Sequence, residues 1–165
     1  MEIRFWSPLR VRVSSVPTPA ELMFEDEFAD LKAVVEAKGW KLAGGKDLRF
    51  ILGVPAKDGT WLYVNCEADQ YRTLPPIWRW CDENGGNADT DAVTAQGGQF
   101  FSSHQVICAP WNRLAYKSID SRGPHNDWTL GDWMSNSYTG QCTTLAAMAM
   151  RISIEAITTY AGRRK

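Results

Sequence analysis

A change of period in the apolar positions separates a helical stretch from a strand-forming stretch. Between residues 18 and 39 the apolar positions recur at helical spacing, and Thr18 and Glu21 stand at the spacing of a capping box. Pro19 suits the first position of a helix, and Gly39 can adopt the left-handed conformation that ends one. The pattern predicts a helix from Pro19 to about Gly39, with an apolar stripe of Leu22, Phe28, Leu31 and Val35.

After residue 47 the period falls to two, which is typical of β-strands. Residues 48–54 alternate between two faces, and Trp61 to Glu67 form the next predicted strand. Asp58-Gly59 lies between them at a turn, so we expect a hairpin whose loop is slightly longer than two residues. Ile77 to Cys81 make a further strand. The middle of the chain is therefore predicted to be an antiparallel sheet.

The second half of the chain mixes loops with a final helix. Residues 82–99 have turn composition and no periodicity, which predicts a long surface loop. Val106-Ile107 is a short apolar run that leads into Cys108, so Cys108 is expected where a buried segment reaches the surface. Residues 128–134 are compatible with a short helical turn, and helical spacing returns from Thr143 onward.

The order of these elements predicts an α+β domain in which helices pack on an antiparallel meander sheet. Residues 18–165 are enough for one such domain, and no repeat divides them. Residues 1–17 show patchy alternation with three arginines and then prolines, which favours an N-terminal arm or an edge strand. We therefore expect a single domain preceded by that arm.

Charge and cysteine content narrow the function classes. The net charge of -1 disfavours nucleic-acid binding, and no apolar run approaches the roughly 20 residues needed to span a bilayer, so we expect a cytoplasmic protein without a membrane partner. The four cysteines are far apart and form no C-x-x-C pair, which disfavours a zinc knuckle and a disulfide framework. We expect neither a cofactor nor a metal.

One segment resembles a known family. Tyr71-Arg72-Thr73-Leu74-Pro75-Pro76 follows the predicted hairpin and resembles the tyrosine-to-diproline segment of ubiquitin-conjugating enzymes. Val106-Ile107-Cys108 resembles the apolar approach to their catalytic cysteine, and Trp128 resembles the tryptophan before their late helices. Arg72 stands where that family usually has proline, and its His-Pro-Asn tripeptide is absent. In this respect the chain, over roughly residues 18–162, is similar to divergent bacterial members of the family.

The resemblance implies a fold, an activity and partners. The implied fold is that of ubiquitin-conjugating enzymes, an antiparallel four-stranded meander sheet with an N-terminal helix and C-terminal helices. The implied activity is that of a transferase, which would accept the C-terminus of a ubiquitin-like modifier on Cys108 as a thioester and pass it to an amine. The implied partners are the modifier, its adenylating activating enzyme and a deconjugating protease encoded nearby, in a bacterial ubiquitin-like pathway of the kind used in antiphage defence.

Five residues are candidates for this chemistry. A thiol near its usual pKa of about 8.5 is partly ionised near neutrality, so Cys108 needs no strong base to accept an acyl group. The tetrahedral intermediate needs a hydrogen-bond donor, for which Asn112 is the first candidate and His104 the second. His125 and Asp127 are candidates to orient or deprotonate the incoming amine. Three of the five have a structural alternative: Asn112 as a turn residue, His104 as a loop-holding residue, and Asp127 as a helix cap.

Two other functions remain open from the sequence. One is an inactive relative that binds a modifier without chemistry. The other is a cysteine hydrolase that uses Cys108 with His125 and Asp127. Against the hydrolase, Pro110-Trp111 predicts an irregular run after Cys108 rather than a helix that would present a nucleophile. A metal site from Cys108, His104 and His125 lacks an obvious fourth ligand.

Overall fold

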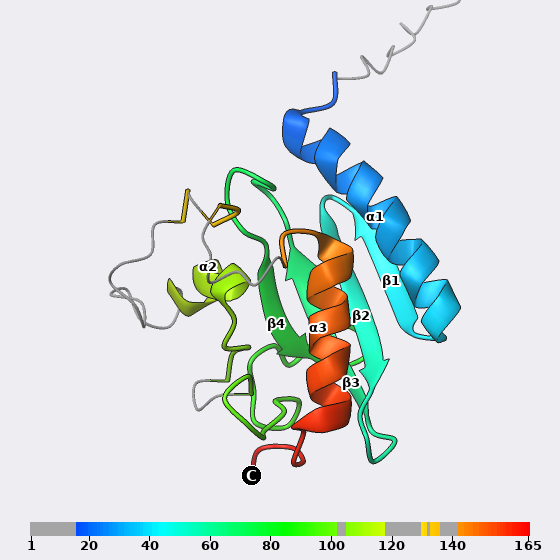
Figure 1. Cartoon of the computed structure of the whole chain (residues 1–165), viewed down its shortest axis with the longest axis vertical. Helices are drawn as coiled ribbons and strands as arrows, with labels where there is room; N and C mark the ends of the chain where they lie inside the picture. Colours follow the sequence, from blue (N-terminus) through cyan, green and yellow to red (C-terminus); the bar gives the residue numbers. More distant parts are fainter. Residues whose placement is uncertain (1–15, 102–104, 118–129, 132, 136–141) are drawn as a thin grey trace, which may run out of the picture.

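The computed structural model describes residues 16–101, 105–117, 130–131, 133–135 and 142–165. In those residues the helix α1 (Pro19–Lys38) precedes four strands, and α3 (Leu145–Thr158) follows them. Between the sheet and α3 lie a 3-10 helix, η1 (Pro110–Asn112), and the short helix α2 (Arg113–Lys117). The order of elements is helix, strands, helices, as expected from the sequence (Figure 1).

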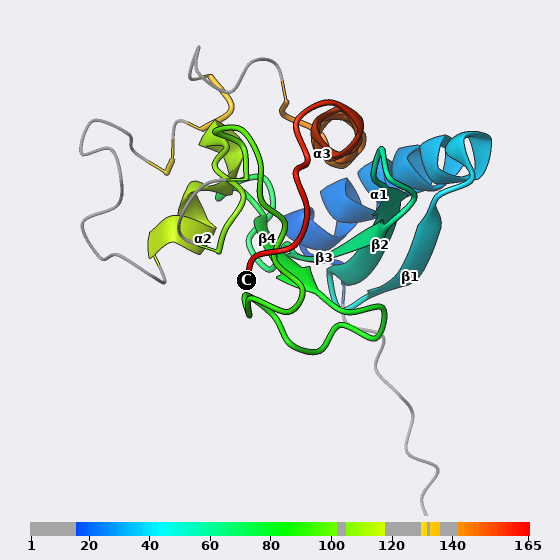
Figure 2. The same ribbon diagram turned by 90° about the horizontal axis from the view of Figure 1, so that it is seen from below.

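The four strands form one antiparallel sheet in sequence order. They are β1 (Lys41–Lys46), β2 (Arg49–Pro55), β3 (Trp61–Glu67) and β4 (Ile77–Cys81). Figure 2 shows α1 and α3 on the same side of the sheet, with α2 beyond the β4 edge. The fold is therefore α+β, with one sheet face covered by helices and the β4 edge turned toward the segment that carries Cys108.

The core lies between the sheet and the two long helices. The pairing register aligns four apolar side chains across the sheet on the face that α1 and α3 cover, and these are Leu42, Leu52, Val64 and Trp80. Leu42 is half-buried, and the other three have an exposed fraction of 0%. α1 begins at the predicted capping box of Thr18 and Glu21, and α3 begins with a Thr144 cap. The sequence prediction of α1, β2, β3, β4 and α3 is confirmed.

Strand β1 is the part of the sheet that no sequence pattern predicted. Its residues Lys41-Leu42-Ala43-Gly44-Gly45-Lys46 lack apolar alternation, and glycine normally weakens a strand. The reason for glycine is a close approach of α1: a Cβ on Gly45 would lie 2.2 Å from the Phe28 ring. The glycine lets β1 pass under the helix. Residues 1–15, part of the predicted arm or edge strand, lie outside the described residues.

Three other expectations are corrected. The sequence predicts Leu22 in the apolar stripe of α1, but its side chain is 51% exposed, and Phe24 is buried instead. Within the predicted surface loop, Thr94 and Ala95 are buried, because that segment pairs with the C-terminal tail through the Arg164 N–H to Thr94 carbonyl bond of 2.9 Å. The run after Cys108 is helical, in η1 and α2.

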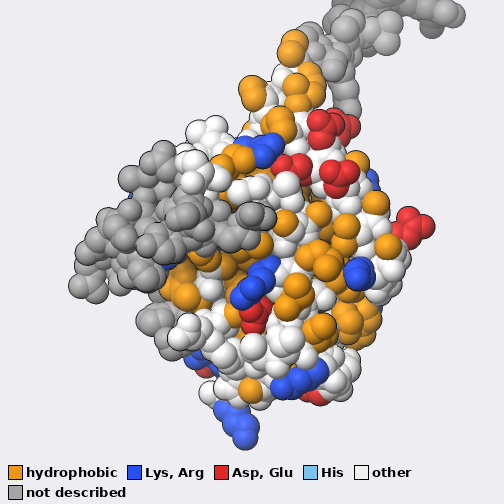
Figure 3. All heavy atoms as spheres, viewed as in Figure 1, with side chains coloured by type: hydrophobic (Ala, Val, Ile, Leu, Met, Phe, Trp, Pro, Cys, Tyr) orange, Lys and Arg blue, Asp and Glu red, His pale blue; other side chains and the backbone are white. Residues whose placement is uncertain are grey.

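The surface seen in Figure 3 has acidic side chains over α1 and apolar side chains over α3. Ile154 and Ile157 of α3 are 44% and 53% exposed.

Among the helices of the described residues, none combines the length and the apolar character that crossing a bilayer requires.

Candidate functional site

Cys108 lies at the point where a buried segment reaches the surface. Val106 and Ile107 are 1% and 0% exposed, whereas Cys108 is exposed. Val106 pairs with Arg79 in an antiparallel bridge, so this segment runs beside the outer edge of β4. The Cys108 N–H donates a hydrogen bond of 2.8 Å to the carbonyl oxygen of Phe100. The exposure of Cys108 that the sequence predicted is confirmed.

Asn112 connects the Cys108 segment to the sheet. Its Oδ1 accepts a hydrogen bond of 2.8 Å from the Trp78 N–H, and its Nδ2 donates to the Trp78 carbonyl oxygen at 3.1 Å. The same Nδ2 donates to the carbonyl oxygen of Ile107 at 3.1 Å. A side-chain amide has two N–H groups, so both are engaged here, and Asn112 is 0% exposed. In this arrangement Asn112 fixes the residue that precedes Cys108.

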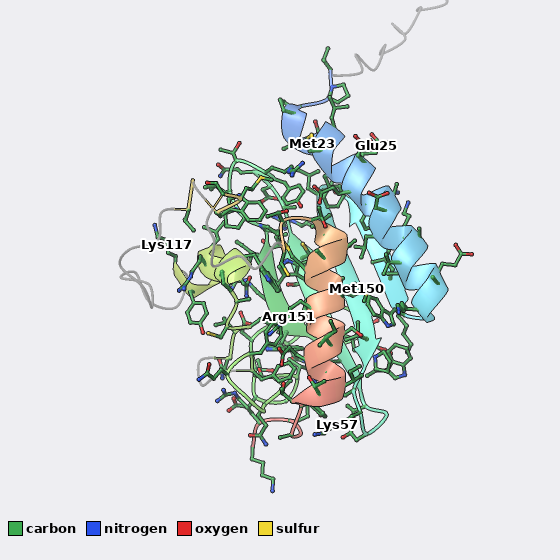
Figure 4. All side chains as sticks on the ribbon, in the orientation of Figure 1. Met23, Glu25, Lys57, Lys117, Met150 and Arg151 are labelled. Atoms are coloured by element: carbon green, nitrogen blue, oxygen red, sulfur yellow. The ribbon has the colours of Figure 1, made fainter. Side chains whose placement is uncertain are left out.

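Aromatic side chains support the same segment from the inside. Trp111, in η1, is 1% exposed and packs edge-on against Trp78 of β4 with ring centroids 6.1 Å apart. It also contacts Phe100, whose ring centroid is 6.3 Å away. On α3, on the side toward β4 in Figure 4, the Arg151 guanidinium lies over the Phe100 ring at 5.8 Å. The segment that contains Cys108 is therefore packed against the core and is not an isolated loop.

The three other cysteines are less accessible than Cys108. Cys66 and Cys81 are both 0% exposed, and burial raises the pKa of each thiol, that of Cys81 to about 12. Cys142 is half-buried; burial raises the pKa of its thiol, and the Arg151 charge opposes that shift. Of the four cysteines, only Cys108 is exposed.

The remaining sequence candidates fall outside the described part of the chain. His104, His125 and Asp127 all lie there, as does Trp128, so of the five candidates only Cys108 and Asn112 can be placed. Those two are brought together through Ile107. Within the described residues, no group of three His, Cys, Asp or Glu side chains could hold a metal ion.

Sequence reasoning missed Glu27, a buried carboxylate beside the tyrosine-to-diproline segment. Glu27 is 7% exposed, and its Oε2 accepts a hydrogen bond of 2.5 Å from the Tyr71 hydroxyl. The Arg72 Nη1 lies 3.5 Å from the Glu27 Oε1, and the Arg72 carbonyl oxygen accepts a hydrogen bond of 3.0 Å from Trp133 Nε1. The sequence offers one indication of this burial: Glu27 directly precedes Phe28, which belongs to the apolar stripe of α1.

Comparisons with protein-family models, with curated proteins and with solved structures found no match. The described residues form an α+β domain whose exposed cysteine lies beside the edge strand of a four-stranded antiparallel sheet.

Proposed function

We propose that the chain is a ubiquitin-conjugating-enzyme-like transferase that carries a ubiquitin-like modifier on Cys108. The observation that carries the proposal is an exposed thiol on a packed segment: Cys108 is exposed, while Ile107 before it and Ala109 after it are buried. The four-stranded antiparallel meander followed by helices is compatible with the fold that the Tyr71–Pro76 resemblance implies. The proposed partners are the modifier, an activating enzyme and a deconjugating protease, in the cytoplasm.

The chemistry has two balanced steps. The Cys108 thiolate attacks the carbonyl carbon of the modifier's thioester on the activating enzyme, and a new C–S bond forms as the old one breaks and its sulfur leaves as thiolate. An amine then attacks the same carbon. A C–N bond forms, the Cys108 sulfur leaves as thiolate, and the amine nitrogen gives its proton to a base. His125 or Asp127 is the proposed base.

The contacts of Asn112 favour a positioning role over direct donation to the oxyanion. Both of its N–H groups already donate to backbone carbonyls, at 3.1 Å each. Donation to a developing oxyanion requires the loss of one of these bonds inside a buried site, which is costly. We therefore propose that Asn112 holds Cys108 in place and that His104 is the candidate oxyanion donor.

One structural observation supports the hydrolase alternative. A 3-10 helix begins at Pro110 and α2 follows at Arg113, so the run after Cys108 is more regular than the sequence predicted. A helix after a nucleophile is compatible with hydrolysis, although α2 is only five residues long. Under this alternative Cys108 cleaves a modifier fusion, with His125 and Asp127 as its partners.

One assay separates transferase, hydrolase and binding module. The purified chain is incubated with a ubiquitin-like modifier and an activating enzyme from the same genome, with ATP, and a thiol-reducible adduct at Cys108 is expected. Cys108→Ser is expected to give a reductant-resistant ester, Cys108→Ala no adduct, and Cys142→Ser, the matched control, a normal adduct. An adduct that persists in Cys108→Ala contradicts the proposal, as does the absence of any adduct. Cleavage of a modifier fusion that stops in Cys108→Ala favours the hydrolase.

A further inference from the structure

The chain after α3 pairs with an earlier loop. Residues 161–164, the C-terminal strap, lie beside residues 94–96 in an antiparallel arrangement (Figure 2). The Ala161 N–H donates to the Gln96 carbonyl oxygen at 2.7 Å, and the Gln96 N–H donates to the Gly162 carbonyl oxygen at 2.9 Å. The strap therefore binds this loop as one strand binds another.

Arg163 adds side-chain bonds to this pairing. Its Nη1 donates to the Val93 carbonyl oxygen, and its Nη2 donates to the Trp61 carbonyl oxygen at 2.9 Å. A guanidinium has several N–H groups in a planar fork, so it can bind two carbonyls at once. Because Trp61 is the first residue of β3, this one side chain connects the strap, the loop and the sheet.

The fit between the loop and the end of α3 leaves no space for a side chain at Gly97. A Cβ on Gly97 would lie 2.0 Å from the Thr159 carbonyl oxygen and 2.7 Å from the Ala161 nitrogen. Gly97 pairs with Phe101 in an antiparallel bridge, and the Phe101 ring packs edge-on against Tyr160 with centroids 6.3 Å apart. The contacts therefore continue along the loop as far as Phe101.

The same loop supplies the hydrogen-bond partner of the Cys108 backbone. The Phe100 carbonyl oxygen accepts the bond from the Cys108 N–H at 2.8 Å. The Phe100 ring is buried, and the Arg151 guanidinium of α3 lies over it at 5.8 Å. The end of α3 and the strap thus reach Cys108 through a continuous series of contacts. This support is additional to the one that Asn112 gives through Ile107.

We propose that the C-terminal strap positions Cys108 through Phe100, with Arg163 as the positioning residue. The strap holds the loop, and the loop holds the carbonyl that binds the Cys108 N–H. The effect on rate rests on the proposed transferase function: a thiol whose backbone is fixed loads faster, because sulfur and carbonyl carbon must meet in a defined geometry.

Hydrogen exchange measured residue by residue tests the positioning without any activity. Arg163→Met removes both side-chain bonds, and the N–H groups of Gln96 and Cys108 are expected to exchange on the order of 10-fold faster, while those of β2 and β3 keep their rates. Arg163→Lys, which keeps the charge, is expected to restore part of the protection. Lys57→Met is the matched control, because it removes one positive charge from an exposed side chain near the end of α3 (Figure 4).

The Cys108 N–H decides the outcome, because the strap does not bind it directly. Faster exchange at Gln96 with an unchanged rate at Cys108 overturns the inference, and so does an unchanged rate at both. Equal acceleration in β2 and β3 also overturns it, because that result is a general loss of stability. Where Arg163→Met does not fold, the same comparison is made on Arg163→Lys, for which a smaller acceleration with the same distribution is expected.

The loading rate is measured separately. With a ubiquitin-like modifier, its activating enzyme and ATP, Arg163→Met is expected to load Cys108 on the order of 10-fold more slowly than the wild type, and Lys57→Met at the wild-type rate. Wild-type loading by Arg163→Met overturns the inference. If the wild type itself forms no thioester, the proposed function fails, and the exchange data still decide whether the strap positions Cys108.

Discussion

Asn112 binds Trp78 in the way that a neighbouring strand would. The Asn112 amide accepts a hydrogen bond from the Trp78 N–H at 2.8 Å and returns one to the Trp78 carbonyl oxygen at 3.1 Å. A strand at the edge of a sheet otherwise leaves such groups unpaired. Because the same amide also binds the Ile107 carbonyl oxygen, one side chain pairs the Trp78 backbone groups at the β4 edge and holds the residue before Cys108.

Replacing Asn112 by alanine should destabilise the protein strongly. The substitution leaves the Trp78 N–H and two carbonyls without their partner in a site that is 0% exposed, and each buried unpaired group costs about 1–3 kcal/mol. Urea denaturation measures the free energy of unfolding. Asn84→Ala, at an exposed position, is the control and should change that free energy by less than about 0.5 kcal/mol. Equal effects of the two substitutions would show that the Asn112 bonds do not stabilise the fold.

The sequence predicts the long helices and strands but not the long-range contacts of residues such as Asn112. The long elements follow from local signals: a capping box at Thr18, alternation in β2 and helical spacing in α3. The contacts of Asn112 and Glu27 join residues 34 and 118 positions apart, and no local pattern encodes such pairs. The exposure of Cys108 was predictable because a short apolar run ends there. The role of its neighbours depends on tertiary contacts.

Cysteine labelling should follow the accessibility of the four thiols. Cys108 is expected to react first with iodoacetamide near neutral pH, because it alone is exposed. Cys142 should react more slowly, because burial shields it and raises the pKa of its thiol, and each unit of pKa lowers the thiolate population about tenfold. Cys66 and Cys81 should react only after unfolding.

Peptide mapping by mass spectrometry identifies the labelled thiol. Cys108→Ser should remove the fast phase and leave the slow one, and labelling in concentrated urea should modify all the remaining cysteines. A fast phase that survives in Cys108→Ser would place the accessible thiol elsewhere and would contradict the proposed site.

The protein should lose stability at alkaline pH. Burial raises the pKa of the Cys81 thiol from its usual value of about 8.5 to about 12 and also raises the pKa of Cys66 and of the Tyr71 hydroxyl. Between the unfolded and folded pKa values the folded state holds more protons, so the free energy of unfolding falls as pH rises. The contribution of Cys81 is complete below pH of about 8.5 and is lost as pH approaches 12.

Cys81→Ala tests this contribution by its pH dependence rather than by its absolute effect. At neutral pH the variant should be less stable than the wild type because a buried side chain is lost. That difference should shrink as pH rises from 9 toward 12, because only the wild type has a Cys81 thiol to ionise. Urea denaturation across this range provides the measurement, and a difference that stays constant would show that Cys81 does not contribute.

The Tyr71 hydroxyl should stabilise the fold through Glu27, whereas a similar hydroxyl on the outer sheet face should not. Tyr71 is 3% exposed and donates to a buried carboxylate at 2.5 Å, and hydrogen bonds to charged groups contribute about 1.5–3 kcal/mol. Tyr71→Phe should lower the free energy of unfolding by about that amount. Tyr63→Phe removes a hydroxyl that bonds Lys41 at 2.8 Å in an exposed setting, and a loss below about 0.5 kcal/mol is expected. Because both substitutions remove one oxygen atom, the difference between them isolates the buried partner. Equal losses in urea denaturation would mean that Glu27 gains nothing from Tyr71.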